Sequence, residues 1–319
     1  MSANKNTSSP ITQASFGQYV MRPLRSLLGC FIKYIPDKYY IQIKFRYHMG
    51  YSLDLKNPKT LNEKINWLKL HDRTALHTQC SDKYEVRKFV IEKIGEEFLV
   101  PLYFQTEDPN QIIPENITMT PCIIKTNHDS GGGVFVYDKN KIDWAAVQNS
   151  LGERMKHNYF WSSREWQYKN IKPRIIVEKL LQDSNGKIPN DYKVHCFNGK
   201  VRMISVDVGR NTEEHHRNWY SNKWEREPYK WSSHKGKKFT DPSENDLDPP
   251  KNFELMKSLS EKLAAPFNYA RIDWYDVNGQ LFFGEVTFHH DGGYLPILPK
   301  IWDEKLGQEL NLKHIEKES

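Results

Sequence analysis

The chain has 319 residues, and its 46 Lys and Arg against 40 Asp and Glu give a formal net charge of +6. This length suits one large domain or two to three smaller ones, and it is enough to bury a core. The 9 Trp, 17 Tyr and 15 Phe argue against a disordered chain. No run approaches the roughly 20 apolar residues that a membrane-spanning helix needs.

The four cysteines lie far apart and show no spacing typical of a zinc site, so we expect incidental thiols. They are Cys30, Cys80, Cys122 and Cys196. The mild positive charge allows nucleic acid, an anionic membrane face or an acidic small substrate as a partner. The chain has no nucleic-acid-binding motif, so we do not expect a nucleic-acid partner.

Residues 1–18 are polar and lack the basic start and apolar run of a secretory signal. They predict a disordered N-terminus and a cytoplasmic protein. Residues 19–56 are basic and aromatic and predict a helical extension of one or two packed helices. The alternative is a helix on the inner face of a membrane, because Lys and Arg flank its apolar residues.

Residues 57–120 predict an N-terminal α/β subdomain. Thr60 and Glu63 have the spacing of a capping box, which predicts a helix that begins there. We expect a second helix from Ser81, as its cap, to Gly95, where it ends. A strand is expected over residues 98–104.

Residues 121–182 predict a second subdomain. A short β-branched strand over 121–126 is followed by the turn NHDSGGG and the strand VFVYD, which together predict a hairpin with a glycine-rich tip. A helix over 143–157 and a strand over 174–181 follow.

Residues 183–302 predict a C-terminal subdomain with two hairpins. Asn-Gly pairs at 198–199 and 278–279 are typical of tight hairpin turns. Between the hairpins we expect a polar surface loop or mobile lid over 231–251 and the helix Phe253–Ala264. The tail over 303–319 is charged and is expected to be partly helical and solvated. The whole chain therefore predicts an α+β fold of antiparallel hairpins and packed helices.

Two carboxylates stand on the two strands of the last hairpin, among apolar and aromatic residues. Pairing across the 278–279 turn would bring Asp273 and Glu285 close together on one face. Because burying two like charges is costly, a bound divalent cation is one explanation, and Mg²⁺ prefers oxygen ligands. The alternative is two solvated strand carboxylates.

Lys125 ends a buried strand and faces the glycine-rich turn. Glycines let backbone N–H groups approach phosphate oxygens, and a lysine adds a positive charge. The turn is neither a P-loop nor a dinucleotide fingerprint. A flexible hairpin tip explains the same residues equally well.

The order of these motifs resembles the ATP-grasp superfamily, and within it the TupA-like ATP-grasp family of surface-polysaccharide proteins. The match is carried by NPKTLNEKINWLKL, SDKYEVRKFV, IIKTNHDSGG, DYKVHCFNGK and YARIDWYDVNGQLFFGEVTF, and it spans residues 57–293. The resemblance implies an ATP-grasp fold, with two α+β subdomains that grip ATP, and ATP and Mg²⁺ as cofactors.

The resemblance also implies residue roles. Two lysines and the glycine-rich loop would hold the phosphates, a hinge strand the adenine, and an Asp/Lys pair the ribose and phosphate. These cofactor-binding residues are Lys83, Lys125, Ser130, Gly131, Gly132, Gly133, Glu178, Lys179, Leu180, Leu181, Asp191 and Lys193.

The metal ligands implied are Asp273, Glu285 and Thr287. Thr287 stands where the family usually has Asn, which leaves the third ligand open. Arg271 is implied as the catalytic residue that stabilises the acyl phosphate, together with Lys125.

For the substrate, Arg210, His289, His290 and Gly292 are the expected contacts. An acceptor wall of basic and aromatic residues is also expected, because aromatic rings stack on sugars and Arg binds carboxylates. Its further members are Arg202, His215, His216, Arg217, Trp219 and Trp224.

The resemblance implies an ATP-dependent ligase that joins an amino acid to a uronic-acid carboxyl of an anionic surface saccharide, by way of an acyl phosphate. Two alternatives stay open. One is a glycosyltransferase that uses a nucleotide-sugar, for which the Asp207 region is the nearest rival metal site. The other is a non-catalytic module that binds polysaccharide or an anionic membrane.

Overall fold

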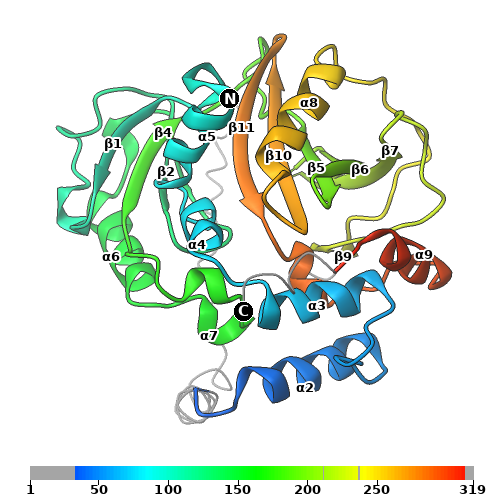
Figure 1. Ribbon diagram of the computed structural model, residues 1–319. Coiled ribbons are helices and arrows are strands. Elements are labelled where there is room, and N and C mark those ends of the chain that lie inside the picture. Colours follow the sequence, from blue (N-terminus) through cyan, green and yellow to red (C-terminus); the bar gives the residue numbers. More distant parts are fainter. Residues whose placement is uncertain (1–32, 211, 236–237, 313–319) are drawn as a thin grey trace, which may run out of the picture.

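The computed structural model describes residues 33–210, 212–235 and 238–312, and it contains two large antiparallel sheets. Figure 1 shows them side by side. The four-stranded sheet has the order β1-β4-β2-β3 and the five-stranded sheet the order β11-β10-β5-β6-β7. A short hairpin of β8 and β9 lies apart from both.

The strands have the following bounds: β1 Leu102–Thr106, β2 Cys122–Thr126, β3 Val134–Val136, β4 Ile175–Lys179, β5 Asp191–Phe197, β6 Lys200–Val208, β7 His216–Ser221, β8 His234–Lys235, β9 Lys238–Phe239, β10 Tyr269–Val277 and β11 Gln280–Thr287. The α-helices are α2 Asp37–Met49, α3 Leu61–His71, α4 Ala75–Ser81, α5 Val86–Ile94, α6 Trp144–Met155, α7 Phe160–Ser163, α8 Phe253–Ala264 and α9 Ile301–Glu309. Short 3₁₀ helices are η1 Glu96–Phe98, η2 Pro109–Gln111, η3 Lys139–Lys141, η4 Trp166–Tyr168 and η5 His290–Gly293.

Each sheet has its own core. Helix α6 packs on β2 of the four-stranded sheet, where Ile124, Leu151 and Val177 share one buried apolar cluster. Helices α5 and α8 pack on the five-stranded sheet, where Val90, Leu263 and other residues bury a larger cluster. The two sheets are therefore separately supported layers that face each other across the middle of the molecule.

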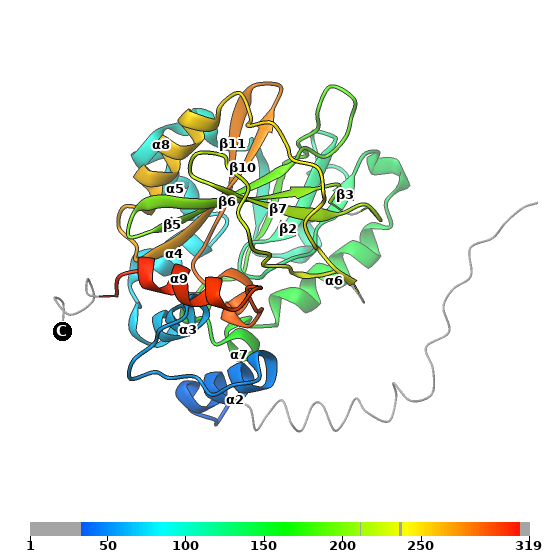
Figure 2. The ribbon, with the colours of Figure 1, turned by 90° about the vertical axis from the view of Figure 1, so that its right-hand side faces the viewer.

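Helices α2, α3 and α9 lie below the five-stranded sheet (Figure 2). The capping box predicted for α3 is present: Thr60 Oγ1 accepts from Glu63 N and the Glu63 carboxylate accepts from Thr60 N. Helix α9 packs closely on this end of α3. A Cβ on Gly307 would lie only 2.0 Å from Lys59 O, so α9 needs a residue without a side chain there.

Both predicted hairpin turns and most predicted elements agree with the structure. Asn198 and Asn278, the first residues of the two turns, have positive φ angles, and the glycines after them do too, as this tight turn requires. The glycine-tipped hairpin forms through pairing of β2 with β3. Part of the predicted helical extension, residues 19–32, lies outside the described residues.

Three local predictions were wrong. Helix α5 begins at Val86 rather than near Ser81, because Asp82 accepts hydrogen bonds from the backbone of Tyr84 and Glu85 and holds a turn there. Only residues 102–104 of the strand expected at 98–104 are extended in β1. The tail from Asp303 is not solvated up to residue 310, because Leu306 and Leu310 are buried against α3 in one apolar cluster.

Within the described part of the chain, no helix is both long and apolar enough to cross a membrane.

Candidate functional site

The predicted site residues gather where the two sheets face each other. The four-stranded sheet contributes cations and a glycine-rich loop, and the five-stranded sheet contributes carboxylates and further cations. Lys83 and Glu285, one from each side, lie close enough for each to shift the pKa of the other.

On the four-stranded sheet, Lys125 in β2 and Glu178 in β4 form an ion pair. Ile123 is directly opposite Glu178, so Lys125 is the diagonal neighbour on the same face. Its Nζ lies 2.7 Å from Glu178 Oε2. Arg87 from α5 approaches the other oxygen of this carboxylate at 3.5 Å.

The glycine-rich loop between β2 and β3 is held by an arginine from α6. Arg154 donates to Asp129 Oδ2 from Nε at 2.9 Å and from Nη2 at 2.6 Å, and also to the carbonyl oxygen of Gly131. Thr126 Oγ1 donates to the other oxygen of Asp129 at 2.6 Å. Gly131 and Gly132 both have positive φ angles, near +73° and +74°. The loop therefore has a fixed base and a backbone conformation that favours glycine.

Lys83 lies in the turn before α5 and reaches the same loop. Its Nζ donates to the carbonyl oxygen of Asp129, and its backbone N donates to Asn127 O at 3.2 Å. The fully buried Asn127 donates to Asp82 Oδ1 at 2.9 Å, which fixes the turn to the end of β2. Burial lowers the pKa of Lys83, against the opposing effect of the Glu285 carboxylate.

The two predicted metal carboxylates lie on one face of the β10–β11 hairpin, beside an irregularity in the pairing between Ile272 and Trp274. One side chain holds both. Arg271 donates from Nε and Nη2 to the two oxygens of Asp273, at 2.7 Å each, and from Nη2 to Glu285 Oε1 at 3.1 Å. Thr287 Oγ1 donates to the same Glu285 oxygen at 3.3 Å.

The Glu285 carboxylate is both partly accessible and electrostatically stabilised. Its side chain is 42% exposed, whereas that of Asp273 is buried. Burial alone would raise the pKa of Glu285, but Lys83, Arg271 and Lys193 lower it below its usual value. This carboxylate is therefore ionised at neutral pH and faces the space between the sheets.

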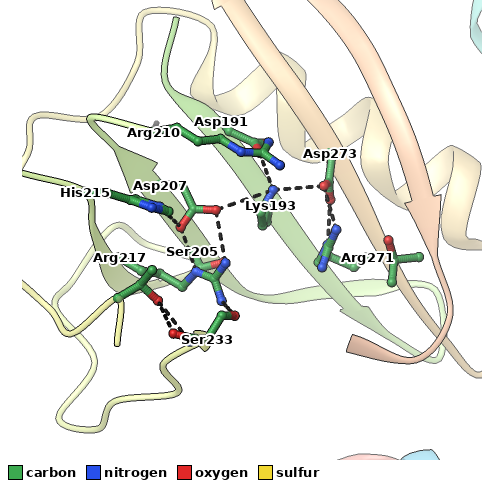
Figure 3. A network of polar contacts seen from close by, with 12 residues as sticks. Asp191, Lys193, Ser205, Asp207, Arg210, His215, Arg217, Ser233, Arg271 and Asp273 are labelled. Atoms are coloured by element: carbon green, nitrogen blue, oxygen red, sulfur yellow. Dashed lines mark hydrogen bonds and ion pairs between the residues drawn. The ribbon is translucent and has the colours of Figure 1, made fainter. Parts of the chain in front are cut away.

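Lys193 in β5 links three carboxylates (Figure 3). It is directly opposite Asp273 in the β5–β10 pairing, with Nζ 3.0 Å from Asp273 Oδ2. It also contacts Asp191 on its own strand, and lies 3.6 Å from Asp207 Oδ2 on β6. Arg210 donates to Asp191 Oδ2 at 2.7 Å. The Asp191 and Lys193 side chains are buried and already paired with protein groups, and their predicted contacts with ribose and phosphate stay predictions.

A series of polar contacts continues from Asp207 towards Arg271, with a gap at His290 Nε2, which has no hydrogen-bond partner among the described residues. Arg217 binds Asp207 through Nε at 2.8 Å and Nη2 at 3.0 Å, and also contacts Ser233. Ser233 Oγ donates to Asp291 Oδ2 at 2.6 Å, and this oxygen lies 3.3 Å from His290 Nε2. His290 Nδ1 then accepts from Arg271 Nη1 at 2.8 Å.

The two histidines after β11 are buried and hold other side chains. Arg271 can only donate, so His290 Nδ1 is the acceptor and the proton of the neutral ring is on Nε2. Burial, with Arg271 and Arg217 nearby, lowers the pKa of His290 well below its usual value. His289 Nδ1 lies 3.2 Å from Gln167 Nε2 and 3.4 Å from Glu165 Oε2. Their predicted substrate roles stay predictions.

Helix α3 supports the turn that carries these histidines. Asn66 Nδ2 donates to Gly293 O at 2.8 Å, and the fully buried Lys69 donates from Nζ to Gly292 O. Lys69 Nζ also lies 4.1 Å from the centre of the Tyr294 ring. Burial lowers the pKa of Lys69 to about 7, partly opposed by Glu165. Gly292 therefore lies at the edge of the site, in a turn that is held in place by hydrogen bonds from α3.

The predicted adenine hinge, Glu178 to Leu181, consists of the last two residues of β4 and the two residues after it. Lys179 N donates to Pro101 O at 3.0 Å and Leu180 N to Pro121 O at 3.1 Å. Leu181 is buried with Val100 and Phe282, at the place where the two sheets are joined by apolar contacts. The hinge is therefore a backbone connection between the two halves of the site.

The donor set suits a hard cation. Asp273 and Glu285 provide carboxylate oxygens side by side, and Mg²⁺ is usually held by one or two carboxylates together with phosphate oxygens and water. Across the described ranges, no three His, Cys, Asp or Glu side chains are grouped so that they could hold a metal on their own. The pair fits a Mg²⁺ ion that arrives with phosphates better than a dedicated metal centre.

The expected acceptor wall was wrong in three members. Trp219 is buried against Trp231, and Trp224 is stacked on Tyr220 in a different apolar cluster, so they do not form a joint surface. Arg202 binds Glu227 and Glu309, beside α9. Arg217 and His215 instead hold Asp207, and this neutralises the rival metal carboxylate.

Sequence reasoning missed Arg154, Asp129 and Asp291. Arg154 is 25 residues from Asp129 along the chain, and nothing in its local sequence indicates the contact. Asp129 did carry a signal, because an acidic residue at the start of a glycine-rich phosphate loop needs a cation to neutralise it. Asp291 directly follows the two histidines, so it could have been predicted as a further polar residue of the same turn.

A family model described as "TupA-like ATPgrasp" matches residues 63–311. The chain belongs to the TupA-like ATP-grasp family. The match covers both sheets and every predicted site residue, from Lys83 to Gly292. No curated protein matched the chain.

Several solved ATP-grasp structures are similar to this member of the family at low identity. D-alanine–D-alanine ligase from Bacillus anthracis has 16% identity and a TM-score of 0.40, over 76% of this chain and 70% of that one. L-amino acid ligase from Bacillus licheniformis has 10% identity and a TM-score of 0.43, over 82% and 57%. The ATP-grasp ligase PsnB, complexed with a minimal precursor, has 10% identity and a TM-score of 0.39, over 73% and 62%. The chain thus spans less than two thirds of the length of the last two proteins.

Proposed function

We propose that this protein is an ATP-dependent carboxylate–amine ligase that joins an amino acid to the carboxyl group of a uronic acid in an anionic surface saccharide. The observation that carries the proposal is the arrangement of Lys83, Lys125 and the glycine-rich loop opposite Asp273 and Glu285. Cations and loop N–H groups on one side, and carboxylates that can share a metal on the other, suit a metal–triphosphate between them.

The reaction has two steps. A carboxylate oxygen of the acceptor attacks the γ-phosphorus of ATP, the bond to the β-phosphate oxygen breaks, and ADP leaves. The amine nitrogen then attacks the acyl carbon, the bond to phosphate breaks, and the nitrogen loses a proton as the amide forms. Negative charge on phosphate oxygens develops in the first step and leaves with phosphate in the second.

The residues of this chain would hold and neutralise that charge. Lys83 and Lys125 would bind phosphate oxygens under the loop that Arg154 fixes. Arg271, held by His290 on one side, would contact the transferred phosphoryl group, because preorganised charges in a buried site stabilise transition states strongly. Asp273 and Glu285 would hold Mg²⁺, which would neutralise phosphate charge when bound.

The uronic-acid acceptor is proposed from the cations around the site and from the family. Arg210 is the most exposed of the cations in the network around Lys193, with Nη1 on Asp191. A planar guanidinium binds a carboxylate through two hydrogen bonds. Arg210 and Gly292 are the proposed acceptor contacts, and the amino acid supplies the amine.

The direct test measures ADP formation with MgATP, a set of amino acids and uronic-acid saccharides. We expect ADP release that needs both an amine and a carboxylate substrate, with activity reduced at least 100-fold in Asp273→Asn and in Glu285→Gln. Asp276→Asn, on the same strand but near the 278–279 turn, is the matched control and should keep the wild-type rate. Unchanged ADP formation in both site variants would reject the site.

Thermal stabilisation separates this function from the glycosyltransferase alternative. A ligand at about 100 times its Kd stabilises the native state by roughly 2.7 kcal/mol. We expect a raised melting temperature with MgATP and MgADP, lost in Lys125→Ala. A shift with nucleotide-sugars alone would replace the ligase proposal by glycosyl transfer.

A further inference from the structure

Helix α2 is apolar on both of its faces. The inner face buries Ile41, Phe45 and Met49 in one cluster with Tyr294. The outer face leaves three large side chains in solvent at positions i, i+4 and i+8: Tyr39, 58% exposed, Ile43, 65%, and Tyr47, 83%. Tyr34, just before the helix, is 84% exposed. The helix lies at the outer edge of the molecule (Figure 1).

The charges around this stripe have one sign. Arg46 is exposed three residues after Ile43 on the same face, and Lys33 and Lys38 are exposed at the N-terminal end of the helix. The nearest carboxylate, Asp37, lies 3.2 Å from Arg73 Nη2 and 3.6 Å from Arg164 Nε, so it is already paired with cations of the protein. The first 36 residues of the chain contain no Asp or Glu.

We propose that the outer face of α2 docks on an anionic membrane surface. Tyr side chains with an apolar ring and a polar end favour the boundary between headgroups and acyl chains, and Lys and Arg are attracted to anionic lipids. Tyr39, Ile43 and Tyr47 would enter this boundary, and Lys38 and Arg46 would contact lipid phosphates. The helix would lie in the plane of the surface.

A second copy of the chain fits this face less well. Two such faces would bring Lys38 and Arg46 of one molecule against the same cations of the other, with Asp37 already occupied. The stripe is also the convex surface of one helix, whereas a bound saccharide is usually held in a concave site.

Helix α2 is connected through α7 to the end of the site that carries His289. Tyr40 Oη and Lys44 Nζ both donate to Ser162 O, in α7. The chain continues from α7 directly to Glu165, which contacts His289.

The test is co-sedimentation of the full chain with vesicles. We expect binding to vesicles of phosphatidylglycerol and phosphatidylcholine, weakened by 1 M salt, and at least tenfold weaker binding to phosphatidylcholine alone. The triple variant Y39S/I43S/Y47S and the double variant K38E/R46E should each bind the anionic vesicles at least tenfold more weakly.

The matched control is I91S/L255S/I301S, which removes three apolar side chains of 45% to 50% exposure from other helices and should bind as the wild type does. Each variant is checked by its melting temperature. Y39W/Y47W keeps the helix and should bind more tightly, which tests the same face without removing apolar surface.

Equal binding by the wild type and Y39S/I43S/Y47S would overturn the proposal, as would a wild type that binds no vesicles. So would a dimer, measured by sedimentation without lipid, that this triple variant abolishes. None of these results depends on ADP formation, so the ligase proposal stands or fails separately.

Discussion

The two sides of the site hold their charges in different ways. On the four-stranded sheet, Lys125 and Arg154 are partly exposed, and each forms an ion pair with one carboxylate. On the five-stranded sheet, Lys193 and Arg271 are buried, and each contacts two or three carboxylates. Lys125 and Arg154 can therefore exchange their partners at a lower cost in free energy than Lys193 and Arg271 can.

This difference suggests that the two sides of the site have different roles in the proposed reaction. Phosphate oxygens could replace Glu178 on Lys125, because Lys125 is partly exposed and Arg87 stays beside the buried Glu178 carboxylate as a second cation. Arg271 and Asp273 are preorganised, since both side chains are buried and are held together by two parallel hydrogen bonds. In the proposed function, Lys125 on the four-stranded sheet would change its partner when ATP binds, whereas Arg271 and Asp273 on the five-stranded sheet would keep theirs.

The largest effect is expected when a lysine on each side of the site is replaced by methionine and the two losses in the free energy of unfolding are compared. Lys193→Met leaves three buried carboxylates without their shared cation and should lower the free energy of unfolding by about 3–5 kcal/mol. Lys125→Met should lower it by less, because Arg87 remains 3.5 Å from the buried Glu178 carboxylate, while it should weaken MgATP binding at least tenfold. Urea unfolding and nucleotide titration measure the two quantities.

Lys141→Met is the control for Lys125→Met, because Lys141 is an exposed lysine of the same half of the molecule, outside the proposed site, with Nζ 3.6 Å from Asp138 Oδ2. It should change neither quantity. Equal losses of stability in Lys193→Met and Lys125→Met would remove the contrast between the two sides.

The next effect concerns stability and pH at the α3–α9 contact. Asp303 Oδ1 and Oδ2 accept from Asn62 N at 3.0 Å and Nδ2 at 2.9 Å, and burial raises the pKa of Asp303 from 3.8 to about 6. Because the folded-state pKa is raised, the stabilisation from this group is complete below its unfolded pKa and is lost as the pH rises through 6. The wild type should therefore lose stability between pH 4 and 7.

Asp303→Asn should abolish this part of the pH dependence, and Asp303→Ala should cost about 1–3 kcal/mol at low pH. Urea unfolding at pH 4.5 and pH 7.0 measures both. A wild type and an Asp303→Asn variant with parallel pH profiles would show that Asp303 does not titrate differently in the folded state.

The sequence predicted the structure correctly where the deciding contacts are between residues that are close together in the chain. The capping box of Thr60 and Glu63 and the Asn-Gly turns fix their elements within four residues, so they could be predicted. Asp273 and Glu285 could be placed together because one hairpin carries both. The roles of Arg154, His290 and α9 depend on packing between distant segments, which no local pattern records. The prediction of a solvated tail was wrong because its few apolar residues are buried in a cluster with α3 and other segments that are distant in the sequence.

A smaller effect is expected from the support of Arg271. His290→Leu removes the acceptor for Arg271 Nη1 and should lower kcat about tenfold, with little change in the KM for ATP. A tenfold change corresponds to about 1.4 kcal/mol of transition-state stabilisation. His290→Asn, whose Oδ1 can accept the same hydrogen bond, should recover part of the loss. An increase in KM alone would instead indicate that His290 binds substrate.

The smallest effect separates two glycines of the loop. Both have φ near +70°, so alanine strains either one by about 1 kcal/mol or less. A Cβ on Gly132 would also lie 1.9 Å from Arg154 Nη1, whereas nothing lies within 4 Å of one on Gly131. Gly132→Ala should therefore weaken MgATP binding severalfold more than Gly131→Ala. Equal affinities, measured by titration calorimetry, would mean that Arg154 moves without consequence for the loop.

The close contact at Gly307 has a consequence for the order in which the protein is made. Every candidate site residue precedes α9 in the chain, yet α9 fixes the beginning of α3, and α3 holds the turn at Gly292. A growing chain on the ribosome therefore carries all of its reactive side chains before the segment that sets their geometry has emerged. The site can therefore reach its final geometry only after α9 has been synthesised. A chain that ended before α9 would contain all of the candidate site residues, but α3 would lack the contact that fixes its beginning.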